Sequence, residues 1–228
     1  MPSNRRIYWA LALLLLFSAV IRALIAGSIE LGNDEVYYWT YARFPDMSHF
    51  DHPPMVGVLI QLFTLNLHFD SEFFLRLGSV VLGTASTWLI FLIGKKIKNP
   101  AAGLYAAFLF TASFYGFILV GTFILPDTPQ VFFWLLSLYL LVCSLPDESL
   151  SKQSRAYLFF AGLSIGLALL SKYHSVFLIF GAGMFILFSN RKWLLAKETW
   201  IALFMAVLIF MPVVFWNSNN NYISFTFS

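Results

Sequence analysis

Acidic and imidazole side chains gather in one short stretch of an otherwise apolar chain. The stretch "GNDEVYYWTYARFPDMSHFDHPPM", residues 32–55, holds four acidic residues and two histidines and closes with a double proline. A carboxylate in such a stretch can accept a proton from a reacting hydroxyl group as a general base. Asp, Glu and His side chains also bind divalent cations, but no spacing in this stretch is diagnostic of a metal site. These side chains are therefore candidates for chemistry; no cofactor is certain, and a divalent cation stays an open alternative.

The neighbours Asp34 and Glu35 are the first catalytic candidates. On a helix, adjacent side chains point about 100° apart, so the two carboxylates are poorly placed to act on one atom. We expect one to face the site and the other to anchor the loop. Asp51 and His52 precede the double proline, which holds the chain extended and rigid, and both are candidates for substrate binding.

The alternative for this stretch is a generic acidic loop on a solvated face. Its aromatic density, "VYYWTYARF", counts against that alternative. Aromatic rings at this position favour a loop embedded in the membrane interface.

A second set of candidates is cationic and could hold an anion. Lys172 directly follows the apolar run "GLALLS", and an ionisable group there is a functional candidate by default. Together with Arg43, Arg22 or Arg76 it could clamp a phosphate. The alternative for Lys172 is a lysine that snorkels to the interface. The substrate-binding candidates among these and their neighbours are Arg43, Arg76, Lys172, Tyr173 and His174.

Asp127 is the third catalytic candidate. It lies between Pro126 and Pro129, and such a break between membrane spans is tolerated only where it lines a cavity or meets water. An aspartate at this position is equally consistent with a turn or with the N-cap of the next span. Motifs of other standard chemistries, such as G-x-x-x-x-G-K-[ST], G-x-S-x-G and H-E-x-x-H, do not occur.

The composition indicates that these residues belong to a membrane protein. The chain has 228 residues, of which 60% are hydrophobic and 11% are charged, and its mean hydropathy is +0.78. A soluble domain carries about 25% charged residues, so lipid is the expected solvent. The net charge of +3 is spread over short clusters between apolar runs, which argues against nucleic acid as a partner.

The expected fold is an all-α membrane bundle of about seven spans in a single domain. A bilayer core about 30 Å thick needs about 20 helical residues. The candidate spans are residues 7–27, 73–94, 101–121, 129–145, 156–173, 175–189 and 199–216. The apolar run 55–69 carries a polar stripe on one helical face and is predicted to lie in the interface without crossing the bilayer.

The distribution of charge supports this topology. If residues 55–69 do not cross, ten of the fourteen Lys and Arg residues share one side, and eight of the eleven acids share the other. This is the positive-inside pattern, so we expect the N-terminus to be cytoplasmic and the acidic loop to face the periplasm or the outside of the plasma (inner) membrane.

Several motifs occur in an order that resembles a known family. Asp34-Glu35 after the first span, "FDHPPM", an arginine that opens the next span, "LPDTPQVFFW", "GLALLSKY" and "WNSNNNYISFTF" follow one another along the whole chain. Together they are similar to bacterial membrane glycosyltransferases of the protein-mannosyltransferase type, which belong to glycosyltransferase family 39, have a GT-C fold and are related to the aminoarabinose-to-lipid A transferases. The position before the double proline departs from the aminoarabinose enzymes, because a lysine is common there and this chain has His52.

The resemblance implies transfer of a sugar from a polyprenyl-phosphate donor to a lipid, glycan or protein acceptor at the outer face of the membrane. It implies that Asp34 is the catalytic carboxylate, with Glu35 beside it, and that Asp127 and Lys172 occupy the polar positions of the family. Such enzymes usually have more spans, so we expect this chain to be the N-terminal part of a longer enzyme. The alternative function is a transporter, or a membrane subunit that binds lipid phosphate without transferase chemistry.

Overall fold

The computed structural model describes residues 4–227, and these residues form helices and connecting loops with no strand among them. The chain divides into two compact units. Unit 1 holds the described residues up to Asp46 together with Met55–Phe132, and unit 2 holds Met47–Pro54 together with the described residues from Phe133. Each unit is described by itself.

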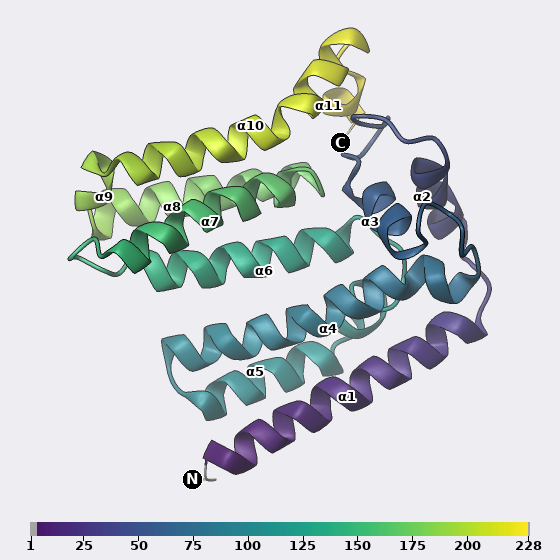
Figure 1. The fold of residues 1–228 in the computed structure, drawn as a ribbon, viewed down its shortest axis with the longest axis horizontal. Helices are drawn as coiled ribbons and strands as arrows, with labels where there is room; N and C mark the ends of the chain where they lie inside the picture. The colour runs from purple at the N-terminus through teal and green to yellow at the C-terminus, as the bar shows by residue number, and fades with distance from the viewer. Residues whose placement is uncertain (1–3, 228) are drawn as a thin grey trace. The chain divides into compact units, whose positions relative to one another are not determined.

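Figure 1 labels the α-helices in their order along the chain. They are α1 (Asn4–Ser28), α2 (Asn33–Arg43), α3 (Met55–Phe63), α4 (Glu72–Ile97), α5 (Pro100–Ala112), the π-helical turn η1 (Tyr115–Leu119), α6 (Asp127–Ser144), α7 (Lys152–Leu169), the short 3-10 helix η2 (Tyr173–Ser175), α8 (Val176–Ser189), α9 (Lys192–Leu195), α10 (Lys197–Asn219) and α11 (Ile223–Phe227).

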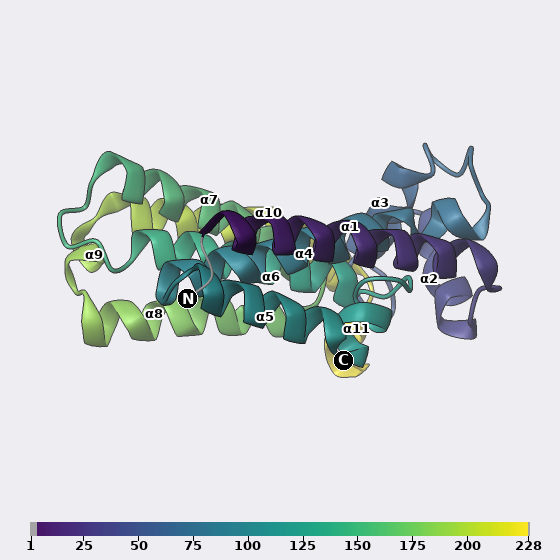
Figure 2. The same ribbon diagram turned by 90° about the horizontal axis from the view of Figure 1, so that it is seen from below.

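In unit 1, α1, α4 and α5 lie side by side (Figures 1 and 2). Ile7 and Leu11 of α1 are buried in one cluster with Phe91 of α4 and Ala107 of α5. The approach of α4 to α5 is close because glycines face each other: a Cβ atom built on Gly94 would lie 2.7 Å from the Cα atom of Gly103. Small residues let helix backbones approach in this way where lipid supplies no hydrophobic driving force.

Charges of opposite sign lie at opposite ends of unit 1. Because Ile7 packs against Phe91, the first turns of α1 lie beside the last turns of α4, and this end carries Arg5, Arg6, Lys95, Lys96 and Lys98. At the other end the last turn of α1 meets the first turn of α4, where a Cβ atom built on Gly27 would lie 3.6 Å from that of Phe73. The chain between these two helices therefore leaves and returns at the same end, which is the acidic one.

The helix predicted at residues 55–69 is helical only as α3, Met55–Phe63. It ends because Leu65, Asn66 and Leu67 all have positive φ angles of 51–62°, and the Thr64 hydroxyl donates to the Ile60 carbonyl and accepts from the Leu67 amide. Nine helical residues extend about 13 Å, less than half of a bilayer core. This length is consistent with the predicted interfacial placement.

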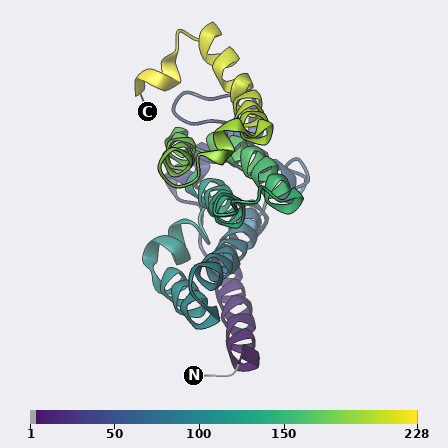
Figure 3. The ribbon, with the colours of Figure 1, turned by 90° about the vertical axis from the view of Figure 1, so that its left-hand side faces the viewer.

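In unit 2, α7 and α10 run parallel and in close contact. A Cβ atom built on Gly162 would meet the backbone of Ala202, and one built on Gly166 would meet the side chain of Ile209. Figure 3 views the helices of this unit nearly along their axes. A common core joins α6 from Phe133 onward with α7, α8, α9 and α10, and its buried residues are Leu140, Leu141, Leu145, Leu158, Ala161, Ile165, Ala168, Leu169, Leu178, Ile186, Trp193, Ala196, Ala202 and Ala206.

Four of the described helices, α1, α4, α6 and α10, are long and apolar enough to cross a membrane, and the apolar segments Pro100–Ala112 and Tyr173–Ser189 are shorter. Large apolar side chains on α1 point away from the protein, such as Trp9 and Leu24, which are 62% and 67% exposed. A helix with such a face is stable in lipid and not in water. The chain is thus a multi-pass membrane protein with an all-helical fold, and the seven-span arrangement and its orientation stay predictions.

Candidate functional site

The centre of the candidate site in unit 1 is a buried ion pair between Glu35 of α2 and Arg76 of α4. The Arg76 Nε and Nη2 atoms lie 2.7 and 2.6 Å from the two carboxylate oxygens of Glu35. The side chain of Arg76 is fully buried and that of Glu35 is 5% exposed. This bidentate arrangement is the strongest geometry that an arginine and a carboxylate adopt.

The remaining donors of Arg76 bind the end of α1. Nη1 donates to the carbonyl oxygens of Ala26 and Ile29, at 2.9 and 2.7 Å, and Nη2 donates to that of Glu30 at 2.9 Å. The ring of Phe123 lies 5.5 Å from the guanidinium carbon. All five N–H donors of the guanidinium therefore have protein acceptors. Arg76 was predicted to bind substrate, and this stays a prediction; a phosphate bound by Arg76 would have to displace one of these acceptors.

Glu35 is equally occupied. Its Oε1 atom also accepts the Ile124 amide at 3.1 Å, and its Oε2 atom also accepts the Gly32 amide at 3.0 Å. The pair thus joins four segments of unit 1: the end of α1, the start of α2, the start of α4 and the turn before α6. Four hydrogen bonds leave little capacity for a reacting proton, so Glu35 fits a positioning role better than the catalytic one expected from the sequence.

The adjacent carboxylate has the opposite environment. Asp34 is exposed in the first turn of α2, and within residues 4–227 no hydrogen bond or ion pair is made to its side chain. Its position is nevertheless fixed, because the next residue is the buried Glu35. The structure therefore presents an exposed carboxylate directly before a buried, hydrogen-bonded one, and whether Asp34 faces a substrate site stays a prediction.

Asp127 is the first residue of α6 and is partly buried. The Tyr115 hydroxyl donates to its Oδ1 atom at 2.9 Å. The following residue, Thr128, is buried and donates to the Val120 and Phe123 carbonyls, which folds the preceding turn onto the start of α6. The role of Tyr115 was not foreseen, because nothing in the sequence distinguishes it from the other tyrosines.

Arg22 lies fully buried in α1 and is held differently from Arg76. Its Nη2 atom donates to the Gly116 carbonyl in η1 at 3.1 Å, and its guanidinium lies 5.0 Å from the Phe117 ring centre. Within the described part of the chain, its Nε and Nη1 atoms have no hydrogen-bond partner. A Cβ atom on Gly121 would lie 2.5 Å from the Nε atom, so this glycine makes room for the arginine.

Arg43 is exposed in the last turn of α2, where a cation is favoured by the helix dipole. It lies nine residues after Asp34 on the same helix, about 13 Å along the axis. The two side chains therefore cannot act directly on one atom of a substrate, and Arg43 would contact another part of it.

The other predicted site residues belong to unit 2. The Asp51 carboxylate lies 3.1 Å from the Nδ1 atom of His52, and both side chains are partly exposed. The carbonyl of the nearby His49 accepts the Ser224 hydroxyl at 2.6 Å, so this segment is attached to the region after α10.

The "SKYH" stretch of unit 2 forms the turn between α7 and α8. Lys172 is partly exposed and His174 is exposed. The Tyr173 ring packs edge-on against Phe210 and Phe225, at 6.1 and 5.3 Å between ring centres. Its position is thus set by apolar packing, while the two cationic candidates reach the surface of the unit.

A metal site finds no support in the geometry of residues 4–227, because no three His, Cys, Asp or Glu side chains there are close enough together to hold an ion. Asp51 and His52 form a pair without a third ligand of this kind.

Residues 51–216 match the family model of dolichyl-phosphate-mannose-protein mannosyltransferase. The lipid A galacturonosyltransferase RgtD of Rhizobium johnstonii is 24% identical over 185 residues, which are 81% of this chain and 38% of that protein. The chain therefore spans well under half the length of this relative.

The solved structures show the same fold at low identity. The protein O-mannosyltransferase Pmt1-Pmt2 complex of S. cerevisiae, bound to its sugar donor, has a TM-score of 0.65 and 20% identity, over 100% of this chain and 35% of that one. The oligosaccharyltransferase of Archaeoglobus fulgidus has a TM-score of 0.64 and 19% identity, over 87% of this chain and 31% of that one. The predicted all-helical fold of GT-C type is confirmed. With nearly three quarters of its residues inside the matched region, this chain belongs to the dolichyl-phosphate-mannose-protein mannosyltransferase family.

Proposed function

We propose that this chain carries the catalytic base of a membrane glycosyltransferase, which moves a sugar from a polyprenyl-phosphate donor to a lipid, glycan or protein acceptor. Asp34 is the base. The proposal is supported by family membership and by the environment of the two adjacent carboxylates, of which Asp34 alone is exposed and unpaired within the described residues.

The reaction needs one proton acceptor and stabilisation of one leaving group. The Asp34 carboxylate takes the proton of the acceptor hydroxyl, whose oxygen forms a bond to the anomeric carbon of the sugar. The bond from that carbon to the phosphate oxygen breaks, and the polyprenyl phosphate leaves with the electron pair. A phosphate is already a good leaving group, so a cation suffices to stabilise it and no strong general acid is required.

The cations proposed to stabilise the developing phosphate charge are Lys172, which matches a polar position of the family by resemblance, and Arg43. His174 stays a candidate for substrate binding. Arg76 is assigned to positioning, because its five donors are occupied within the protein. A divalent cation as an additional partner of the phosphate remains a separate proposal without geometric support.

The observation that carries the proposal is the placement of Asp34 by Glu35. Four hydrogen bonds fix Glu35, and the residue directly before it, Asp34, presents its carboxylate to the outside of unit 1. A catalytic base must be held within a fraction of an ångström of its productive position, which a buried cross-link of this kind achieves.

The test replaces Asp34 with Asn in membranes that contain the protein. Wild type is first assayed with a panel of radiolabelled polyprenyl-phosphate hexoses, hexuronic acids and pentoses to find the donor. Asp34→Asn is expected to lower turnover by a factor of about 100 or more while donor binding is retained, because only proton transfer is removed. Asp70→Asn is the matched control, since Asp70 is an exposed acid in the same inter-helix segment.

Undiminished sugar transfer by Asp34→Asn would show that another group is the base. A wild-type protein that binds the labelled donors but transfers sugar from none of them would favour a lipid-phosphate-binding subunit. Passage of a donor or sugar across sealed vesicles without transfer would favour a transporter.

We further propose that the protein lies in the plasma or inner membrane with a cytoplasmic N-terminus and an outward-facing site. The proposal is supported by the separation of charge in unit 1, where basic residues lie at one end and Asp34 and Glu35 at the other. Single cysteines at the exposed positions Lys96 and Asp70, at opposite ends of unit 1, are expected to react with an impermeant reagent from opposite sides of the membrane. Reaction of both from the same side would contradict this orientation.

A further inference from the structure

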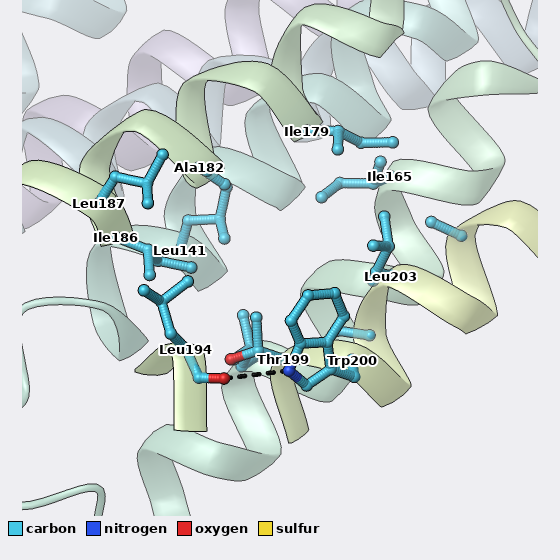
Figure 4. A pocket seen from close by; sticks show the side chains of 15 residues that line it. Leu141, Ile165, Ile179, Ala182, Ile186, Leu187, Leu194, Thr199, Trp200 and Leu203 are labelled. Carbon is cyan, nitrogen blue, oxygen red and sulfur yellow. Dashed lines mark hydrogen bonds between the residues drawn. The ribbon is translucent and has the colours of Figure 1, made fainter. Parts of the chain in front are cut away.

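Two cavities of unit 2 share one short segment of the chain. The first is an apolar groove of about 220 Å³ between α7, α8 and α10, with Leu194 and Trp200 among its lining residues (Figure 4). The second is a polar pocket of about 330 Å³ to which residues 195–198 contribute. Leu194, Thr199 and Trp200 line the groove, and the residues between them, 195–198, line the polar pocket, so the two cavities adjoin one segment at the turn from α9 to α10.

The polar pocket has an excess of positive charge. Arg155, Lys192 and Lys197 line it, against the single carboxylate of Glu198. Glu198 is already paired with Arg155 at 3.2 Å. Lys192 lies 3.3 Å from Glu148, in a pair that is mostly exposed, and such pairs contribute little. Lys197 is exposed and has no ion pair within residues 4–227. The pocket can therefore accept an anion such as phosphate.

The surface beside this pocket is strongly apolar. Leu195 is 93% exposed, and the cationic residues Lys192 and Lys197 lie three positions before it and two positions after it. Trp200 is 58% exposed, and its indole N–H donates to the Leu194 carbonyl at 3.0 Å, which holds the ring against the groove (Figure 4). Tryptophan and lysine near each other, together with an exposed leucine, are typical of the boundary between lipid head groups and acyl chains.

We propose that residues 192–200 bind one anionic phospholipid. Its phosphate lies in the pocket between Lys192 and Lys197, and one acyl chain lies in the apolar groove past Trp200. Basic pockets between membrane helices bind anionic head groups in this way. A lipid fits this segment because it carries both an anionic head group for the polar pocket and an acyl chain for the apolar groove, whereas a free phosphate would leave the groove and Leu195 uncovered.

The binding test uses the full chain purified in a neutral detergent and titrated with dioleoylphosphatidylglycerol, with bound lipid counted by native mass spectrometry. Wild type is expected to bind one phosphatidylglycerol in preference to phosphatidylcholine. Lys192→Gln together with Lys197→Gln is expected to weaken phosphatidylglycerol binding about 30-fold, because two interfacial cations are removed. The matched control is Lys96→Gln with Lys98→Gln, a pair of exposed lysines at the basic end of unit 1, and it is expected to leave binding unchanged.

The groove is tested separately with two glycines of α8. Gly183 lines the groove, and a Cβ atom built there meets nothing within 4 Å, so Gly183→Leu has open space at its Cβ atom and adds side-chain volume to the groove. It is expected to weaken lipid binding about tenfold by displacing methylene groups of the acyl chain. Gly181 is equally open but does not line this groove, so Gly181→Leu is the matched control.

Three results would overturn the proposal. Equal loss of binding in the Lys96/Lys98 variant would show a general response to charge. Equal affinity for phosphatidylcholine would show that the phosphate pocket does not select the lipid. Inorganic phosphate that competes fully with the lipid, with no effect of Gly183→Leu, would show a free-anion site. None of these measurements depends on glycosyl transfer, so they are independent of the role of Asp34.

Discussion

Replacement of Glu35 by Gln should separate the structural task of this residue from any catalytic one. The amide keeps one acceptor oxygen, but its NH₂ group replaces the other carboxylate oxygen and faces two donors of the protein. One of these donors is the Arg76 guanidinium, and the second is the Ile124 amide or the Gly32 amide, depending on which oxygen is replaced. It also leaves the fully buried Arg76 cation without a counter-charge. Removal of one partner of a buried ion pair costs about 3–5 kcal/mol of folding free energy. We expect a loss of this size.

The free energy of unfolding is measured by equilibrium titration of the full chain from a mild into a denaturing detergent. Glu198→Gln is the control variant, because Glu198 makes a comparable contact with Arg155 but the arginine side chain is 43% exposed. A partly exposed pair contributes about 1 kcal/mol or less, so this variant should unfold nearly as wild type does.

The double variant Glu35→Gln/Arg76→Gln decides whether the two side chains act as one unit. The combined loss should be smaller than the sum of the single losses by about 2 kcal/mol, within the range seen for residues in contact. If Glu35→Gln costs no more than Glu198→Gln, or if the two losses add, then the pair does not hold the four segments of unit 1 together and Asp34 is positioned by other contacts.

Two further predictions concern packing and pH. Gly83→Ala should lower the free energy of unfolding by about 1–3 kcal/mol, because the added Cβ atom would lie 2.4 Å from the Gly121 Cα atom. Gly181→Ala is the control: it adds a methyl group in open space and should have little effect on the same unfolding titration. In the α6–α7 loop, hydrogen bonds from the Ser149 and Ser154 hydroxyls and from the Ser149 and Ser151 backbone amides hold the pKa of Asp147 well below its ordinary value of 3.8. The stabilisation from the ionised carboxylate is therefore complete above about pH 4 and is lost as the pH falls toward the folded-state pKa. Asp147→Asn should be less stable than wild type at neutral pH, and the difference in stability should shrink progressively below about pH 4. A difference in stability that does not change with pH would contradict this prediction.

The helical class and the sorting of charge followed from the sequence because both depend on composition and on short periodic patterns. Apolar runs of bilayer length identify helices in any arrangement, and the basic clusters around Arg5 and Lys96 do lie at one end of unit 1. The end of α3 did not follow, since three consecutive residues with positive φ, Leu65–Leu67, carry no glycine that would signal the turn. That turn depends on the Thr64 hydroxyl, a local contact that is invisible to hydropathy.

The sequence identified candidate site residues by their chemical type, but it did not predict which contacts their side chains make. An arginine that opens an apolar helix suggests either a phosphate ligand or a structural ion, and the sequence does not decide between them. The decision comes from the backbone carbonyls of Ala26, Ile29 and Glu30, which face Arg76 only after α1 and α4 have packed. Carbonyl groups occur at every position, so no sequence pattern marks the three that matter.

The different roles of Asp34 and Glu35 follow from helix geometry. Gly32 is the N-cap of α2, which makes Asp34 the second and Glu35 the third residue of the helix. A side chain at the third position reaches back to the N-cap amide, and glutamate is long enough to do so while its other oxygen meets Ile124. The second position points about 100° away, and a shorter aspartate there stays at the helix N-terminus, where the dipole stabilises a negative charge. The order Asp-Glu therefore places an anchored carboxylate inside and an available one outside, and the reverse order would leave the shorter side chain unable to span from Gly32 to Ile124.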